Sequence, residues 1–137
     1  MARTFLIGRL IFGAFFIYSG LGHLLSVGAM APYAAAKGVP APEFAVIGSG
    51  LLILFGGISI LLGWRPELGV TAIVVFLVGV SIPMHNFWAE ADAATRANDM
   101  GHFMKNMALV GAALMLVAIP QPWPYSVAAG TRRPIQA

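Results

Sequence analysis

Seven polar side chains that could bind a ligand or exchange protons lie inside or at the ends of long apolar runs. They are Arg9, His23, His85, Asn86, His102, Lys105 and Asn106. Their groups donate and accept hydrogen bonds, and imidazole also binds metals or exchanges protons near neutral pH. A titratable group within a membrane span is costly unless protein or water surrounds it, so these residues are functional candidates.

The elements that must position these side chains are four apolar runs, at residues 4–25, 43–64, 67–88 and 102–120. At about 1.5 Å of rise per residue, each run can cross a hydrocarbon core about 30 Å thick. Of the 137 residues 59% are hydrophobic and 9% charged, which does not fit an ordinary soluble domain. We predict an all-α, polytopic membrane protein: one four-helix transmembrane bundle over residues 1–137, with 121–137 as an interfacial tail.

Positively charged residues predict the orientation of this bundle. The side shared by both termini holds Arg3, Arg65, Arg132 and Arg133, whereas the loops on the other side hold Lys37 and Arg96. Because cytoplasmic loops carry the excess of lysine and arginine, both termini are predicted to be cytoplasmic. All three tryptophans fall at predicted span ends, as expected for interfacial rings. The expected location is the inner (cytoplasmic) membrane of a bacterium.

Composition and spacing argue against several other classes. Arg3 and the Ala29–Met30–Ala31 triplet imitate a signal peptide, but the first run is too long and Pro32 would follow the cleaved bond. The chain has no cysteine, so it carries no disulfide or thiolate metal site of its own. Its formal net charge of +3 comes from residues at span ends rather than from one basic patch, so no nucleic-acid partner is expected.

The connections between the runs differ in character. Residues 26–42 are punctuated by glycine and proline, and residues 33–37 are expected to form one short interfacial turn. Residues 63–66 should form a tight turn. The segment from Glu90 to Asp99 is the most polar of the chain, and we expect it to continue from the third run as a water-exposed helical piece.

Small residues recur at helical spacing within the first two runs. In the first run the stripe consists of Arg9, Gly13, Phe16, Gly20 and His23, which lie within about 40° of one line on a helix. In the second run a similar stripe consists of Ser49, Gly56, Ser59 and Gly63. Helices in lipid associate through close packing of small residues, so these faces should point inward.

Six of the polar side chains, His102 and the other two histidines among them, share one depth, at the outer ends of the first, third and fourth spans. We predict that five of the six line one cavity: His23, His85, Asn86, Lys105 and Asn106. Such groups can be ordinary interfacial or snorkelling side chains, or they can hold the polar head of a quinone or lipid. Histidines on different helices can also ligate a haem or metal, but no His-x-x-x-His pair is present and we assign no metal site.

Several segments together resemble the DoxX family. They are Arg9 with Gly13, residues 19–24, the Gly38–Val39–Pro40 turn, His85–Asn86–Phe87–Trp88 and residues 103–109 around Lys105 and Asn106. The resemblance covers about residues 5–118. It implies a four-helix membrane protein related to the small membrane subunit of thiosulfate:quinone oxidoreductase and to partners of redox-defence enzymes.

The sequence departs from this family in two places. Family members often have a lysine where His23 stands and a glutamate within the second span, where this chain offers only glycine, serine and apolar side chains. What carries over by position is Arg9, the segment from His85 to Trp88, and Lys105 with Asn106. A proton relay through a second-span acid is therefore not expected here.

The sequence thus predicts an accessory subunit of a membrane redox system, serving a quinone-linked oxidoreductase. No catalytic residue is assigned, and quinone is the one cofactor suggested. The predicted binding residues are His23, His85, Asn86, Lys105, Asn106 and Arg9. One alternative is a non-enzymatic scaffold or assembly subunit, and another is a haem- or metal-binding electron carrier. The expected partners are the lipid bilayer and either other subunits or further copies of this chain.

Overall fold

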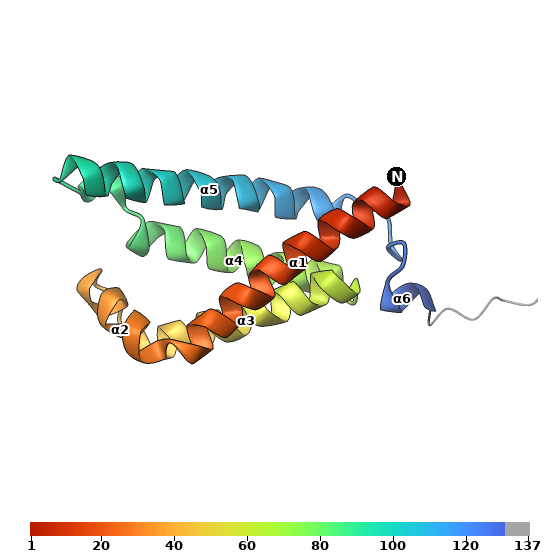
Figure 1. Cartoon of the computed structure of the whole chain (residues 1–137), viewed down its shortest axis with the longest axis horizontal. Helices are drawn as coiled ribbons and strands as arrows, with labels where there is room; N and C mark the ends of the chain where they lie inside the picture. The colour runs from red at the N-terminus through yellow and green to blue at the C-terminus, as the bar shows by residue number, and fades with distance from the viewer. Residues whose placement is uncertain (131–137) are drawn as a thin grey trace, which may run out of the picture.

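The computed structural model describes residues 1–130, and the regular structure of this part is helical throughout (Figure 1). Four long helices carry the apolar runs: α1 (Ala2–Leu25), α3 (Pro42–Leu62), α4 (Pro66–Met84) and α5 (Ala93–Val117). Three short helices are α2 (Val27–Ala36), the 3-10 helix η1 (Phe87–Ala89) and α6 (Val127–Gly130). All four spans are long and apolar enough to cross a membrane, which confirms the predicted all-α bundle.

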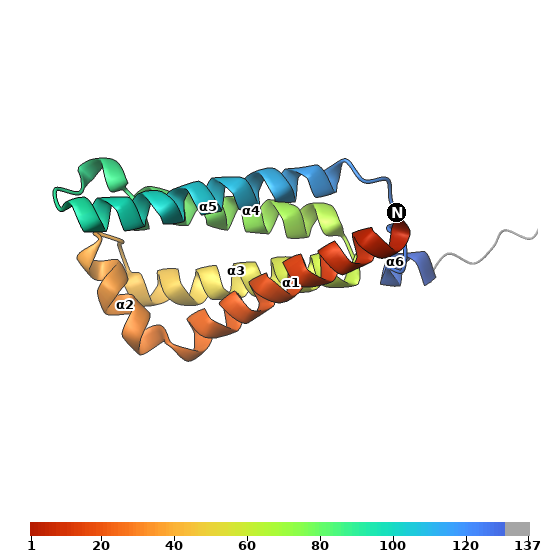
Figure 2. The ribbon, with the colours of Figure 1, turned by 45° about the horizontal axis from the view of Figure 1, so that its top comes forward.

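The long helices pack in chain order as two layers of two (Figure 2). α1 lies against α3 in one layer, α4 lies against α5 in the other, and contacts between α3 and α4 join the layers. The N-terminus and α6 lie at one end of the bundle, called here the terminal end, and α2 lies at the opposite end, called here the α2 end (Figure 1).

Proline and glycine set the boundaries of α3 and α4. Each helix begins with a proline, Pro42 or Pro66, whose missing N–H costs nothing in the first turn. α3 ends at Leu62 and is capped by Gly63, whose φ of 63° is the left-handed conformation that glycine adopts without strain. α4 ends at Met84 rather than near residue 88, because Pro83 cannot continue the helical hydrogen bonds and His85 leaves helical geometry at a φ of −130°.

The polar segment from Glu90 to Asp99 does not continue the third span, and that expectation was wrong. The chain turns after η1, and α5 begins at Ala93, so the fourth helix extends from residue 93 to 117 rather than from 102 to 120. Its N-cap is Asp92, whose carboxylate accepts hydrogen bonds from the backbone N–H and the hydroxyl of Thr95 at 2.8 and 2.9 Å. This cap fixes the start of the helix, and Asp99 falls on its buried side.

The first connection is also more helical than expected. α2 extends over ten residues, Val27–Ala36, where the sequence suggested a single turn at residues 33–37. Its alanines favour a helix, and two of them, Ala31 and Ala34, pack on Val46 of α3. α2 therefore covers one side of the α2 end.

Glycines hold α1 and α3 together. The buried residues of α1 are Arg9, Gly13, Phe16 and Gly20, four of the five in the predicted stripe. A Cβ atom added at Gly13 would lie 2.8 Å from Leu61 Cβ and 2.9 Å from the Gly57 carbonyl oxygen, and one at Gly20 would lie 2.8 Å from the Gly50 oxygen. The two backbones are thus in direct contact at these positions.

α3 presents a second small-residue face to α4. A Cβ added at Gly56 would lie 2.7 Å from Ile73 and 3.0 Å from the Gly69 carbonyl oxygen. Of the predicted second stripe, Gly56, Ser59 and Gly63 are buried and Ser49 is partly buried. Because different glycines face α1 and α4, α3 packs closely on both sides.

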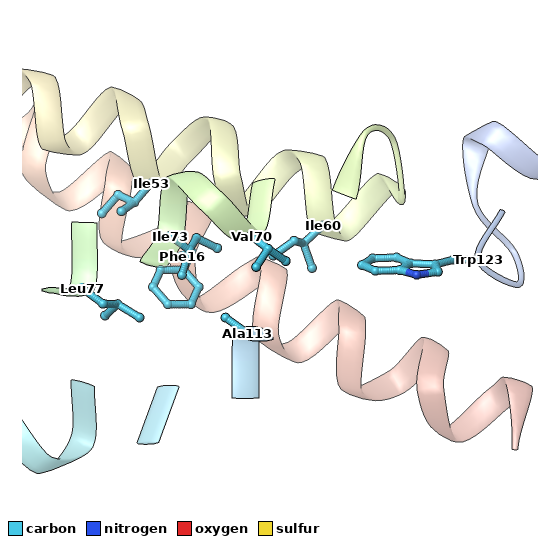
Figure 3. Close-up of a cluster of buried hydrophobic side chains, with 8 residues drawn as sticks. All are labelled: Phe16, Ile53, Ile60, Val70, Ile73, Leu77, Ala113 and Trp123. Atoms are coloured by element: carbon cyan, nitrogen blue, oxygen red, sulfur yellow. The ribbon is translucent and has the colours of Figure 1, made fainter. Parts of the chain in front are cut away.

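The apolar core extends along the bundle from Leu77 of α4 to Trp123 at the terminal end (Figure 3). It consists of Phe16, Ile53, Ile60, Val70, Ile73, Leu77, Ala113 and Trp123. Figure 3 shows the ring of Trp123 reaching from the tail toward Ile60. This indole is 1% exposed, and Phe5 meets it edge-on with ring centroids 5.2 Å apart. The tail therefore inserts a side chain into the protein; residues 131–137, part of the predicted interfacial tail, lie outside the described residues.

Candidate functional site

A cavity of about 500 Å³ opens between the helices near the α2 end. Its walls are mainly apolar and come from α1, α2, α3, α4 and α5, with side chains such as Phe16, Met30, Leu52 and Phe76. Seven polar side chains from four helices and one connection interrupt these walls: Ser19, His23, Tyr33, Ser49, His85, Lys105 and Asn106. A volume of this size with few polar groups is typical of a small-molecule site.

Four of the six predicted binding residues line this cavity: His23, His85, Lys105 and Asn106. Asn86 follows His85 in the chain but lies outside the lining, and its Oδ1 is buried without a hydrogen-bond partner among the described residues. Arg9 is at the terminal end, away from the cavity. The structure thus brings together residues of α1 and α5 with His85, which directly follows α4.

The last turn of α1 fixes the ring of His23. Its Nδ1 lies 2.9 Å from the carbonyl oxygen of Ser19, so Nδ1 carries the hydrogen and donates it. Phe76 meets the imidazole edge-on, with ring centroids 5.7 Å apart. In the neutral ring Nε2 is then a hydrogen-bond acceptor. The four-residue spacing of Ser19 and His23 gives a local hydrogen bond, and it is the backbone of Ser19 that accepts it.

His85 occupies the break between α4 and η1. Its Nδ1 is buried, has no hydrogen-bond partner among residues 1–130, and lies 3.7 Å from Oδ1 of Asp99. The ring of His102 stacks on it at a centroid distance of 5.0 Å and an angle of 13°. Because α4 ends at Met84, directly after Pro83, His85 leaves the helix and faces α5.

Three hydrogen bonds position the polar groups of α5 at the cavity. Asn106 Nδ2 donates to Ser81 Oγ at 3.0 Å, and this hydroxyl donates to the carbonyl oxygen of Leu77 at 2.6 Å. Lys105 Nζ donates to His102 Nδ1 at 3.3 Å. Asn106 and Ser81 are both buried, whereas Lys105 is exposed as a residue.

An ion cluster lies beside the cavity, and sequence reasoning missed it. Lys37 Nζ donates to Glu90 Oε1 at 2.6 Å and to Asp99 Oδ2 at 3.0 Å. The side chain of Asp99 is 3% exposed and that of Lys37 is 16% exposed. The hydrogen bonds from Glu90 and Asp99 raise the pKa of Lys37 above its ordinary value. From the sequence alone, Lys37, Glu90 and Asp99 were placed in separate water-exposed segments. Their opposite charges at the same end of the bundle were the signal that could have predicted the cluster.

Arg9 binds the C-terminal segment at the terminal end of the bundle. It is 2% exposed, and its two terminal nitrogens donate to the carbonyl oxygens of Pro124 at 3.2 Å and Tyr125 at 3.0 Å. The ring of Trp123 lies 6.0 Å from its guanidinium carbon. Its Nε is buried without a partner among the described residues. Arg9 thus connects α1 with the C-terminal segment.

Metal ligands do not gather in the described part of the chain. Among residues 1–130 no three histidine, aspartate or glutamate side chains converge in a way that would hold a metal ion. The polar groups at the cavity are instead two imidazoles, an ammonium, an amide and the hydroxyl groups of Ser19, Tyr33 and Ser49. These groups donate and accept hydrogen bonds to oxygen atoms.

Comparison with known proteins gives one match. The DoxX family model matches residues 4–86, which include α1 to α4 and the cavity residues His23 and His85. The searches of curated proteins and of solved structures found no significant match. The matched region is more than half of the chain, and it ends before α5, which supplies Lys105 and Asn106.

Proposed function

Because this chain belongs to the DoxX family, we propose that it is an accessory subunit of a membrane redox system whose cavity at the α2 end binds a quinone-like molecule. The chain is a multi-pass integral membrane protein, with four apolar helices of spanning length. We place it in the inner membrane of a bacterium, with the α2 end outside. The cavity is the observation that carries the proposal.

The chemistry of the cavity suits a molecule with an apolar body and a polar ring. Apolar side chains from all five surrounding helices offer a surface to the body, and the volume of about 500 Å³ falls in the range of small-ligand sites. Lys105 can donate to a carbonyl oxygen, as can the N–H group of Asn106 that Ser81 does not use.

Binding of a short-chain ubiquinone to the full chain in mild detergent tests the pocket. We expect saturable binding, and we expect Lys105→Met to weaken it about tenfold, as for loss of a charged hydrogen-bond donor. Methionine keeps the apolar stem, so helical content should be unchanged. Arg96→Met is the matched control, because Arg96 is exposed and bonds only to the carbonyl oxygens of Glu90 and Ala91 among the described residues.

If the protein in detergent takes up no more ubiquinone than empty micelles do, the proposed pocket is contradicted. The accessory role itself is tested by purification in mild detergent: a redox enzyme should co-purify, and purification of the chain alone under all mild conditions would count against it.

One observation favours the second candidate, a scaffold that performs no chemistry. Of the most apolar stretch of α5 only 11% is buried, compared with 39% for α3. α5 contacts α4 and η1, so much of its surface is open to lipid or to helices of another subunit. If quinone binding fails while a partner still co-purifies, this candidate is the better account.

A further inference from the structure

We propose that the cavity binds the reduced, phenolic form of its ligand, and that His85 removes the phenolic proton, with Asp99 behind the imidazole and Lys105 near the resulting phenolate. This inference rests on the proposed function, because it concerns the same cavity. It adds the hydroxyl-bearing class of ligand and an acid–base role that neither the family match nor the sequence assigns.

The cavity offers hydrogen-bond acceptors as well as donors. His23 uses its Nδ1 hydrogen on the carbonyl oxygen of Ser19, so Nε2 of the neutral ring accepts. Nδ1 of His85 faces Asp99, which leaves its Nε2 for a ligand. An oxidised quinone presents only carbonyl oxygens and needs donors alone, whereas a quinol or phenol also brings O–H groups that need acceptors. Two imidazole acceptors therefore fit the reduced form better.

The pairing of His85 with Asp99 suits a base. A carboxylate behind an imidazole orients the ring and stabilises the imidazolium that forms when the ring takes a proton. Here Oδ1 of Asp99 lies 3.7 Å from the buried Nδ1 of His85. Hydrogen bonds of this kind are often loose until a ligand binds. Lys37 holds the other oxygen, Oδ2, at 3.0 Å, so the carboxylate is fixed in place.

The other charged and titratable groups around His85 come from every neighbouring element. α5 provides Asp99, His102 and Lys105, and the α2–α3 connection provides Lys37. The segment after η1 provides Glu90, which pairs with Lys37, while α1 provides His23 and α2 provides Tyr33. Among residues 1–130 the basic side chains whose nitrogens lie within 4.0 Å of a carboxylate oxygen are Lys37 and His85, and not Lys105. Lys105 is thus a cation at the cavity that a phenolate can neutralise. It lies next to His102, whose ring stacks on His85.

The proposed step is a proton transfer without electron transfer. The phenolic O–H bond breaks, the proton forms a bond with Nε2 of His85, and the electron pair stays on the ligand oxygen. The products are an imidazolium beside Asp99 and a phenolate near Lys105. Each new charge then has an opposite charge close by, which favours the charged form.

A chromophoric phenol tests this step in the full chain in detergent. The probe is 4-nitrophenol carrying a short alkyl chain, because its phenolate absorbs visible light and its phenol does not. We expect the ionisation midpoint of the bound probe to lie about one pH unit or more below that in empty micelles, a tenfold change in the equilibrium. His85→Gln should restore the micelle midpoint, Lys105→Met should restore part of it, and Arg96→Met should leave it unchanged.

A second measurement needs no variant. The methyl ether of the same probe has no proton to give, so wild-type protein should bind the phenol about tenfold more tightly than the ether at neutral pH. Equal binding of phenol and ether, a bound probe with the micelle midpoint, or a lowered midpoint that persists in His85→Gln would overturn this inference while leaving the pocket intact. Failure of the phenol, the ether and ubiquinone to bind would instead overturn the proposed function.

Discussion

Lys37 and Asp99, which are 62 residues apart in the chain, form an ion pair with 3.0 Å between Nζ and Oδ2. The pair connects the segment between α2 and α3 to the second turn of α5, and Glu90 extends it to the segment after η1. One cluster therefore joins the α2–α3 connection, the segment between η1 and α5, and α5 itself. His85 and the cavity lie directly against this cluster.

We predict that Lys37→Met destabilises the protein by about 1–3 kcal/mol, because it leaves the carboxylate of Asp99 buried without its partner. Thermal unfolding in detergent measures the effect. Arg96→Met removes an exposed cation at the same end and should cost less than about 0.5 kcal/mol. Equal losses in the two variants would show that the cluster adds no stability.

The pH dependence of this difference follows from the raised pKa of Lys37. A pKa that is higher in the folded state gives stability that is complete below the unfolded value, about 10.4, and is lost as the pH rises through the folded value. The difference between wild type and Lys37→Met should therefore hold through about pH 10 and shrink only above it. A difference that disappears between about pH 8 and 10 would contradict the pairing.

Gly13→Ala should destabilise the bundle by about 1–3 kcal/mol, because the new methyl group would lie within 3 Å of Leu61 and of the Gly57 backbone. Gly8→Ala is the matched control: it is on the same helix, and nothing lies within 4 Å of its added Cβ. Detergent-resistant thermal stability compares the two. If both changes are tolerated equally, the α1–α3 contact is not as close as described.

Trp123→Ala should cost about 3–5 kcal/mol, because it empties a fully buried site between Phe5, Arg9 and the core. Trp88→Ala removes the same side chain from a position that is 58% exposed and should have a small effect. Trp123→Ala should also make the peptide bonds after residue 120 more accessible to protease. Resistance equal to that of wild type would place the tail's anchor elsewhere.

The distribution of positive charge predicts the orientation of the bundle in the membrane, and cysteine labelling tests it. A cysteine replacing Ala94 should react with an impermeant maleimide in intact cells, and one replacing Ala129 should react only after permeabilisation. Both positions are exposed, and the chain has no other cysteine. Labelling in the opposite pattern would invert the bundle and place the cavity on the cytoplasmic side.

Much of the fold follows from the sequence because lipid and helix geometry constrain it strongly. Run length gives the four spans, and the spacing of Arg9, Gly13, Phe16 and Gly20 gives the buried face of α1. The start of α5 was misjudged because its first turns are polar, although Asp92 and Thr95 form a visible N-cap. A hydropathy pattern marks where a helix is apolar, not where it begins.

The candidate site was predictable in depth but not in pairing. His23, His85, Lys105 and Asn106 share a level in the spans, and this level locates the cavity. Which side chains face each other depends on the rotation of α5 about its axis and on the break after Pro83. The spacing of residues in the sequence determines neither that rotation nor the direction of the chain after the break. For this reason Asp99 and Lys37 were not recognised as neighbours of His85.

The hydrogen bonds between Arg9 and the tail have a consequence for biosynthesis. The carbonyl groups of Pro124 and Tyr125 that receive the guanidinium are 115 and 116 residues later in the chain than Arg9. α1 therefore enters the membrane with a cation whose partners have not yet been translated. During that interval water or the insertion machinery must solvate Arg9, and its two hydrogen bonds to the tail form only after the ribosome has made the segment around Tyr125.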